Sequence, residues 1–346
     1  MSGSMKTRIP LYIFLSLFSL VSCQKLRDKI SLQGILMAGT AVEERVQMSY
    51  EYYLLYKNDY SYLDATFSED GGYTFLIGAD SHLTTDPGRM DEMLAIGLKD
   101  NDLFYAHLGD IADTKPEYYI TLDSLLQEAK QRYVKANYIR IDEYKYKRKA
   151  DQEEEPETFL YDEILFPFYP VVGNHDITHN GWALWSNIFH SSFYEVDVIT
   201  TGEDGDYCFD RLIFLDSASG TLGKTQIDLI RKRALDGGQN LYRHTFVFSH
   251  TNIFRPQFFE FASTFTREET FFLLDQFEKW NVSGVFCGHV HTWDERNYNG
   301  VHYITLDTMC EKNNPEPGDY LVRITVDKDG TLFWEPVHMN YTPKKK

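Results

Sequence analysis

The chain has 346 residues, of which 43% are hydrophobic and 15% aromatic, and its formal net charge is −18. This supply of apolar side chains excludes a globally disordered polymer, and the length fits one large domain or two small ones. The acidic balance argues against general nucleic-acid binding, because phosphate backbones attract clustered Lys and Arg. An anionic substrate is still allowed, since bound metal ions can reverse the charge of a pocket.

Residues 1–23 have the composition of an export signal. Lys6 and Arg8 form a short basic region, and the apolar run at 11–21 is too short to span a bilayer as a stable helix. The run is followed by Cys23, and the segment resembles a bacterial lipoprotein signal, in which this cysteine becomes the lipidated first residue. An ordinary secretory signal with an incidental cysteine is the alternative. We therefore expect a protein of the cell envelope, on the periplasmic side or the outer surface, with the membrane as a partner through a lipid anchor at Cys23.

The other three cysteines are Cys208, Cys287 and Cys310. None of them lies in a CxxC spacing, which argues against a thiolate zinc site. Cys287 lies in an apolar run and is expected to be a small buried hydrophobic residue. In an exported protein two of the three can pair, and the sequence does not say which two.

The rest of the chain is expected to be a tether and N-terminal extension at 24–70, a main domain at 71–340 and a basic tail at 341–346. A helix is expected near the start, over 42–55. Within the main domain a short apolar run is followed repeatedly by a polar cluster, which is typical of buried strands. These strands are expected at 73–77, 103–108, 168–172, 245–248 and 282–287. Helices are expected at 90–99, 122–137, 224–235 and 267–280.

Strands that alternate with helices predict an α/β architecture with helices outside the sheet. Residues 115–166 separate two of the strands and are expected to be an insertion. Its charged middle, 145–157, is expected to be a solvated loop or the end of a helix. Further strands are expected at 301–306, 320–326 and 331–337, the last two joined as a hairpin by an Asp-Gly turn.

All five polar clusters fall at the carboxyl ends of expected strands, where ligands collect in such sheets. The clusters contain three carboxylates, four imidazoles and one carboxamide. These are Asp80, His82, Asp110, Asp113, Asn174, His250, His289 and His291, with His175 and Asp176 beside them. The mixture suits transition-metal ions such as Mn, Fe, Zn, Co or Ni, and it has too much imidazole for a calcium cage.

The clusters occur in the order D-x-H (80–82), GD-x-x-D (109–113), GNHD (173–176), a lone His250 and GH-x-H (288–291). This ordered set resembles the calcineurin-like metallophosphoesterase family, as a bacterial lipoprotein member, over roughly residues 72–310. GNHD and GHVH are specific motifs, whereas D-x-H alone is weak. The resemblance implies a four-layer αββα metallophosphoesterase sandwich, in which two mixed β-sheets are flanked by helices, and a centre of two metal ions.

The resemblance also implies a role for each residue. One metal ion would be held by Asp80, His82, Asp110 and His291. Asp110 would bridge to a second ion, which Asn174, His250 and His289 would hold. His175 would lie beside the substrate and protonate the leaving group or stabilise phosphoryl charge. The resemblance assigns no role to three further residues: from their positions beside the motifs, Asp113 and Asp176 are expected to orient ligands or cap the backbone rather than bind metal, and His179 is expected to reach the substrate.

The expected activity is hydrolysis of a small phosphate ester, either a diester or a monoester. Two adjacent cations neutralise phosphoryl charge and lower the pKa of a bridging water, which provides hydroxide for attack on phosphorus. A pyrophosphate or nucleotide hydrolase of the same fold is an alternative. A non-catalytic, metal-bearing binding lipoprotein of the envelope is another, and the complete set of motifs with His175 argues against it. The absence of HExxH argues against a metallohydrolase that acts on amides.

Overall fold

The computed structural model describes residues 41–60, 62–68, 71–113, 115–150, 166–236, 241–254 and 265–342. The expected export signal with Cys23, the tether up to residue 40, residues 151–165 of the expected insertion and residues 343–346 of the tail lie outside these segments. None of the helices in the described segments has the length and apolar character that a bilayer span requires.

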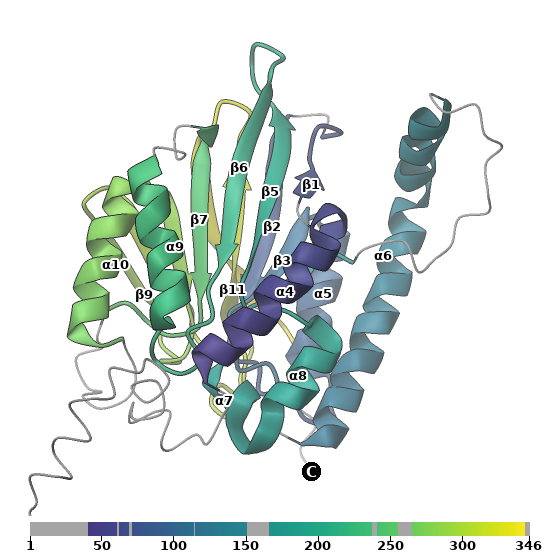
Figure 1. Cartoon of the computed structure of the whole chain (residues 1–346). Coiled ribbons are helices and arrows are strands. Elements are labelled where there is room, and N and C mark those ends of the chain that lie inside the picture. The colour runs from purple at the N-terminus through teal and green to yellow at the C-terminus, as the bar shows by residue number, and fades with distance from the viewer. Residues whose placement is uncertain are drawn as a thin grey trace, which may run out of the picture.

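Two β-sheets lie face to face at the centre of the molecule (Figure 1). The larger sheet has the strand order β1-β5-β6-β7-β8-β10-β9, and the smaller has the order β12-β11-β2-β3-β4. Both sheets are mixed, with parallel strands in the middle and antiparallel strands toward an edge. The strands are β1 (Tyr62–Asp64), β2 (Tyr73–Gly78), β3 (Phe104–His107), β4 (Phe168–Pro170), β5 (Tyr194–Thr201), β6 (Tyr207–Phe214), β7 (His244–Ser249), β8 (Gly284–Cys287), β9 (Asp294–Tyr298), β10 (Val301–Thr305), β11 (Gly318–Val326) and β12 (Leu332–Met339).

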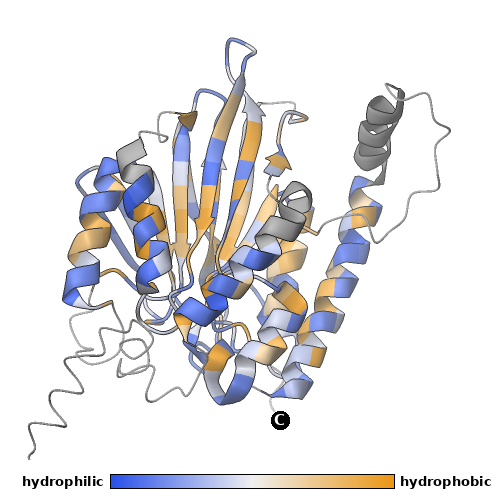
Figure 2. Cartoon of the chain, viewed as in Figure 1, coloured by the Kyte–Doolittle hydropathy of each residue, from blue (hydrophilic) through white to orange (hydrophobic). Residues whose placement is uncertain are grey.

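Helices cover the outer face of each sheet. The helices are α4 (Val42–Tyr60), α5 (Gly88–Lys99), α6 (Pro116–Ala150), α7 (Asn174–Ile177), α8 (Gly181–Phe189), α9 (Gly223–Asp236) and α10 (Arg267–Lys279), with a short 3-10 turn, η2, at Thr178–Asn180. Apolar residues of α4, α9 and α10 pack on the larger sheet, and those of α5, α6 and α8 pack on the smaller one. The hydropathy colouring in Figure 2 shows apolar and polar stretches alternating along α9, α10 and the lower part of α6, as in helices with one buried side. The four-layer αββα sandwich expected from the sequence is therefore confirmed.

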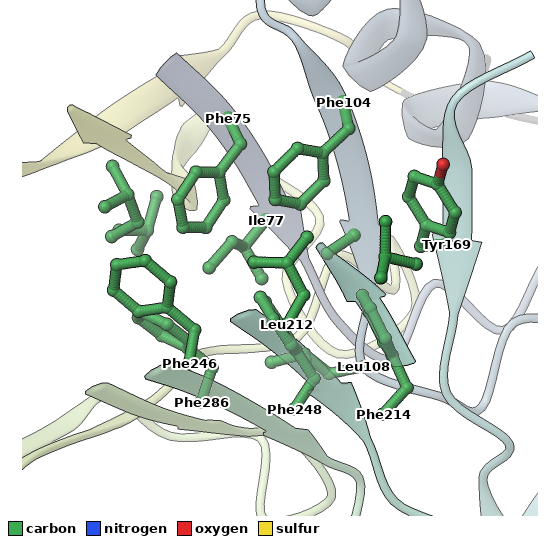
Figure 3. Close-up of a cluster of buried hydrophobic side chains, with 14 of the residues drawn as sticks. Phe75, Ile77, Phe104, Leu108, Tyr169, Leu212, Phe214, Phe246, Phe248 and Phe286 are labelled. Atoms are coloured by element: carbon green, nitrogen blue, oxygen red, sulfur yellow. The ribbon is translucent and has the colours of Figure 1, made fainter. Parts of the chain in front are cut away.

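Stacked aromatic rings and aliphatic side chains fill the space between the sheets (Figure 3). Phe75 of β2 stacks on Phe104 of β3 at 4.5 Å between ring centroids, and Phe214 of β6 stacks on Phe248 of β7 at the same separation. Successive residues of a strand point to opposite faces, so Leu76 packs instead against the helices outside the smaller sheet. Because both faces of β2 are buried, its sequence is an unbroken apolar run, which is why the run could be recognised.

Helix α4 is fixed to the larger sheet by a buried ion pair. Both side chains of the pair are fully buried, and Nε of Arg45 donates to Oδ2 of Asp216 over 2.7 Å. Nη2 of Arg45 donates to Oδ1 of the same carboxylate, also over 2.7 Å. Since Asp216 lies two residues after the end of β6, this pair attaches α4 to the loop at the carboxyl end of that strand.

The expected insertion at 115–166 contains one long helix, because α6 runs through Pro116–Ala150. The first six residues of the charged segment 145–157 therefore belong to a helix. The hairpin expected around the Asp-Gly turn is present: β11 and β12 pair in antiparallel fashion, and the amide of Gly330 donates to the carbonyl of Asp327 over 2.9 Å. Cys208, Cys287 and Cys310 are free thiols, and burial raises the pKa of Cys287 to about 12.

Candidate metal centre

The polar clusters of the sequence meet at one edge of the sandwich. They follow β2, β3 and β4 of the smaller sheet and β7 and β8 of the larger one, and these five strands are joined by parallel pairings within each sheet. Backbone hydrogen bonds connect the first two loops, from the amide of Asp80 to the carbonyl of Gly109 at 3.1 Å and from the amide of His82 to the carbonyl of Asp110 at 3.0 Å. Parallel strands deliver their carboxyl ends to the same edge, so residues far apart in the sequence lie side by side.

Three groups of side chains in the described segments can hold a metal ion, and Asp80, His82 and His291 form the first of them. Nε2 of His291 lies 3.4 Å from Oδ1 of Asp80, and Nε2 of His82 lies 3.4 Å from Nε2 of His291. Asp80 is fully buried, whereas the side chain of His291 is 26% exposed. The group therefore has a buried carboxylate at its base and opens toward solvent.

Asp110, His250 and His289 form a second group. Nε2 of His250 lies 3.1 Å from Nδ1 of His289 and 3.5 Å from Oδ2 of Asp110. Oδ1 of Asn174 lies 2.8 Å from the same His250 nitrogen, so the carboxamide joins this group. The donor atoms of all four residues converge on one small volume.

Asp110 lies between the two groups. Its Oδ2 is 3.8 Å from Nε2 of His82 in the first group and 3.5 Å from Nε2 of His250 in the second. Its Oδ1 accepts a 2.7 Å hydrogen bond from the backbone amide of His175. One carboxylate oxygen thus faces both groups while the other is held by the main chain.

The spacing of these donor atoms fits coordination of a metal ion. Two donors bound about 2.1 Å from one ion lie roughly 3.0 to 3.4 Å apart in octahedral or tetrahedral geometry. The observed separations between neighbouring donors run from 2.8 Å for His250 and Asn174 to 3.8 Å for His82 and Asp110. Nitrogen and oxygen atoms that can each bind a cation converge here, so one ion among them would be held by several ligands at once.

The imidazole tautomers also fit a metal. Nδ1 of His250 lies 2.7 Å from the carbonyl of Leu108, which can only accept, so this nitrogen carries the hydrogen. Nδ1 of His82 lies 3.3 Å from Oδ1 of Asp113, and the same argument applies. In both rings Nε2 is left to offer its lone pair to the shared volume.

The electrostatic field at the site favours positive charge. Burial by itself would lower the pKa of His82, but the hydrogen bond to Asp113 and the charges of Asp110 and Asp80 raise it to about 10. Burial by itself would raise the pKa of Asp80, yet the hydrogen bond from His291 and the charge of His250 hold it well below its usual range. A field that holds a proton this strongly equally favours a metal cation in its place.

Five of the seven expected metal ligands have a left-handed backbone. The φ angles are 52° at Asp80, 42° at His82, 51° at Asp110, 73° at His289 and 54° at His291. Such a conformation costs about 1 to 2 kcal/mol per non-glycine residue, and strained residues of this kind gather at functional sites. The alternate spacing in D-x-H and H-x-H thus corresponds to paired left-handed residues directly after β2 and β8.

Glycines of the motifs allow the loops to approach closely. A Cβ atom at Gly173 would lie 2.1 Å from the backbone nitrogen of Asp110 and 2.2 Å from its Oδ1. A Cβ atom at Gly288 would lie 2.6 Å from Oδ2 of Asp80. Neither position leaves room for a side chain, which explains glycine before Asn174 and before His289.

His175 and Asp113 lie at the mouth of the site. Nδ1 of His175 is 3.3 Å from Oδ1 of Asp113, and the two side chains are 45% and 47% exposed. Asp113 contacts His82 through the same oxygen, and these three residues form the third group that can hold a metal ion. The hydrogen bond with Asp113 raises the pKa of His175.

Asp176 and His179 have different surroundings. Asp176 is fully buried and accepts hydrogen bonds from the amides of Gly173 at 2.8 Å and Ile111 at 3.1 Å, so it joins the loops after β3 and β4. Burial and the neighbouring charge of Asp110 raise the pKa of Asp176 to about 8. His179 lies in η2 with a φ of 46° and belongs to none of the three groups found in the described segments.

A further loop contributes to the site and carries no motif that the sequence analysis used. The hydroxyl of Thr308 donates to the backbone carbonyl of Asp80 over 2.7 Å. The side chain of Asn313 lies 3.3 Å from Nδ1 of His291. Both residues follow β10, whose apolar run leads into polar residues, and this was the only signal that could have revealed them.

No protein-family model and no curated protein sequence matches the chain. Among solved structures, GAP50, "the anchor in the inner membrane complex of Plasmodium", is similar with a TM-score of 0.50 and 11% identity, covering 80% of this chain and 90% of that one. A dimetal phosphatase from Danio rerio matches with a TM-score of 0.43 and 11% identity over 78% and 99% of the two chains. The calcineurin-like phosphoesterase YfkN from Bacillus subtilis matches with a TM-score of 0.40 and 10% identity over 79% and 90%. At these identities, the likeness to GAP50 shows a shared fold and nothing further.

Proposed function

We propose that this protein is a metal-dependent phosphoesterase that hydrolyses a phosphate diester or monoester at a centre of two metal ions. The observation that supports the proposal is the position of Asp110. Its Oδ2 faces an imidazole of each group, at 3.8 Å from His82 and 3.5 Å from His250. A carboxylate oxygen between two sets of nitrogen donors is the arrangement that a bridging ligand needs.

The donor sets assign the residues to the two ions. Asp80, His82 and His291 would hold one ion together with Asp110, and Asn174, His250 and His289 would hold the other together with Asp110. When bound, such a pair of cations neutralises phosphoryl charge and activates water for attack on phosphorus. Nitrogen and oxygen donors of this kind suit Mn, Fe, Zn, Co or Ni.

His175 is suited to protonate the departing oxygen of the ester. Its imidazole is 45% exposed at the mouth of the site, where a substrate can reach it. Asp113 accepts from Nδ1 and raises the pKa of the ring, so Nε2 is left with a proton to donate. Transfer of that proton to the leaving alkoxide neutralises the charge that develops as the P–O bond breaks.

The test is turnover measured together with metal content. The full chain, purified in detergent and loaded with Mn, Zn, Fe or Co, would be assayed on bis-para-nitrophenyl phosphate and para-nitrophenyl phosphate. Hydrolysis that EDTA abolishes and metal restores is expected, and the preferred ester separates a diesterase from a monoesterase. Two bound ions per chain without turnover on either ester or on a nucleotide would favour a binding or anchoring role, the kind of role for which GAP50 is described.

We also propose that the protein is anchored in the cell envelope through a lipid on Cys23. The support is the sequence of the first 23 residues, in which a basic start and an apolar run lead into the cysteine. Cys23→Ser should prevent incorporation of labelled palmitate and move the protein out of the membrane fraction. Membrane association that is unchanged in this variant would contradict the anchor.

A further inference from the structure

The loop of residues 306–314, which follows β10, packs against the loop that carries Asp80. The amide of Met309 donates to the carbonyl of Ala79 at 3.0 Å, and the hydroxyl of Thr308 donates to the carbonyl of Asp80 at 2.7 Å. Thr308 is 1% exposed. Because Asp80 has a φ of 52°, its carbonyl does not point toward a neighbouring strand as it would in a regular sheet. The hydroxyl of Thr308 donates the hydrogen bond that this buried carbonyl needs.

The same loop reaches His291. The side-chain amide of Asn313 lies 3.3 Å from Nδ1 of His291, while Nε2 of that ring lies 3.4 Å from Oδ1 of Asp80. The ring is thus held on one side by Asn313, and its other nitrogen faces the metal-binding group. Asp80 and His291, which are two of the five left-handed residues, therefore each have a polar partner from the 306–314 loop.

The carboxamide of Asn313 can form a hydrogen bond with Nδ1 of His291 whether or not that nitrogen carries the hydrogen. A metal ion at Nε2 requires the hydrogen on Nδ1, which must then donate to an acceptor. The oxygen and nitrogen of a carboxamide exchange places when the group turns over, so Oδ1 of Asn313 can accept that hydrogen. When Nε2 carries the hydrogen instead, Nδ2 of Asn313 donates to the lone pair of Nδ1.

We propose that Asn313 is a positioning residue that fixes the orientation of the His291 ring, and that Thr308 holds Asp80 in the matching conformation. The 306–314 loop would thereby set the affinity of one metal position, formed by Asp80, His82 and His291. His250, at the other position, is oriented by the carbonyl of Leu108 from a different segment. The inference rests on the metal centre of the proposed function and does not depend on what ester, if any, is hydrolysed.

The experiment is a Mn²⁺ titration of the full chain followed by electron paramagnetic resonance. Two adjacent Mn²⁺ ions give an exchange-coupled signal, whereas one isolated ion gives six lines. Replacement of a partner that orients a ligating histidine costs 10- to 100-fold in metal affinity as a rule. Asn313→Leu should therefore lower the affinity for one of the two Mn²⁺ ions by roughly that factor. At Mn²⁺ concentrations that give the wild type its coupled signal, the variant should still give six lines.

Two conservative variants and one matched control test whether the hydrogen bonds of Asn313 and Thr308 are responsible for the change in affinity. Asn313→Asp keeps an acceptor for the Nδ1 hydrogen of His291 and should restore the coupled signal. Thr308→Ser keeps the hydroxyl and should also show the coupled signal, whereas Thr308→Val should not. Asn297→Leu removes another asparagine that contacts a histidine, His302 at 3.2 Å on β9 and β10, and should leave both affinities unchanged. Melting of each variant in EDTA shows whether the fold is kept.

Imidazole ¹⁵N spectra of the diamagnetic Zn form show directly whether Nε2 of His291 binds the ion. The metal-bound ring is expected in the wild type and in Asn313→Asp at a Zn²⁺ concentration that leaves this position mostly empty in Asn313→Leu. Equal weakening of both metal positions, or wild-type affinities in Asn313→Leu, would each overturn the inference. A wild-type protein that binds two ions but turns over no ester would refute the phosphoesterase proposal alone, and one that binds no metal would refute both.

Discussion

The backbone amide of His175 and the carboxylate of Asp110 are joined by a 2.7 Å hydrogen bond across the loops after β3 and β4. The bond occupies Oδ1 and leaves Oδ2 between His82 and His250. It also places the imidazole of His175 beside the residue that would bridge the metal ions. The proposed proton donor and the proposed bridging ligand are therefore positioned by a single contact.

Loss of Asp110 should remove both metal ions. Asp110→Ala deletes the carboxylate oxygen that faces an imidazole of each group, so each group loses a ligand and the negative charge that attracts a cation. We expect less than one ion per chain after dialysis, measured by inductively coupled plasma mass spectrometry. Asp228→Ala is the control, because that carboxylate is 43% exposed on α9 and belongs to none of the three groups in the described segments, and it should keep both ions. Two ions retained in Asp110→Ala would exclude the bridging role.

Loss of His175 should affect turnover and spare metal content. A general acid contributes about 10²- to 10⁴-fold to rate, and the loss is greatest when the leaving group is a poor one. His175→Ala should therefore slow an alkyl phosphate ester much more than a para-nitrophenyl ester, with two ions still bound. Asp113→Asn should also slow the hydrolysis of both esters, but by a smaller factor than His175→Ala does. Full activity of His175→Ala on the alkyl ester would assign the proton transfer to another group.

Strands β2, β3, β7 and β8 could be predicted because they are buried on both faces. Phe75, Leu76 and Ile77 of β2 all have 0% exposure, so the sequence contains an apolar run that ends where the polar ligands begin. The edge strand β9 reads Asp-Glu-Arg-Asn-Tyr and is mostly exposed, and such a strand has no hydrophobic signal to recognise. β5 alternates buried and half-buried residues and so has no continuous apolar run, and neither it nor β6 was predicted.

The expected site residues were found through motifs, and residues without a motif were missed. Asn313 is an exposed residue two positions after Glu311, and nothing in the local sequence separates it from Asn314. Its contact with His291 spans 22 positions and depends on how the loop after β10 folds over the loop after β8. Likewise, the left-handed conformation of Asp80 is imposed by the tertiary structure, because aspartate alone does not require it.

Gly173 should be intolerant of any side chain for steric reasons alone. Its φ of −99° is accessible to every residue, but an added Cβ would lie 2.1 Å from a backbone nitrogen of Asp110, which cannot move without breaking the site. Gly173→Ala should lower metal affinity and destabilise the fold by about 1 to 3 kcal/mol, as overpacking does. Gly205 is the matched control, because its φ is +86° and an added Cβ would meet nothing within 4 Å. Gly205→Ala should cost only about 1 kcal/mol and leave metal binding intact, measured by urea unfolding and Mn²⁺ titration.

His107 should make the fold sensitive to acid. It is fully buried in β3, and neither ring nitrogen has a hydrogen-bond partner among the described residues. Burial lowers the pKa of His107 from 6.5 to about 3, so the folded protein keeps this ring neutral. Below pH 6.5 the unfolded chain binds a proton that the folded protein does not, and stability falls by up to about 1.4 kcal/mol per pH unit.

Replacement by an apolar residue should remove this pH dependence. The unfolding free energy of wild type, relative to His107→Leu, should decrease as pH falls from 7.5 through 6.0 to 5.0, measured with urea in EDTA so that metal release does not contribute. The direction follows from the lowered pKa of His107 in the folded protein. The full stability is present above the pKa that His107 has in the unfolded chain. It decreases as pH falls from that pKa toward the lower pKa of the folded protein. His338→Leu is the control, since that side chain is 54% exposed. A difference between wild type and His107→Leu that stays constant over this pH range would mean that His107 accepts a proton within the folded protein.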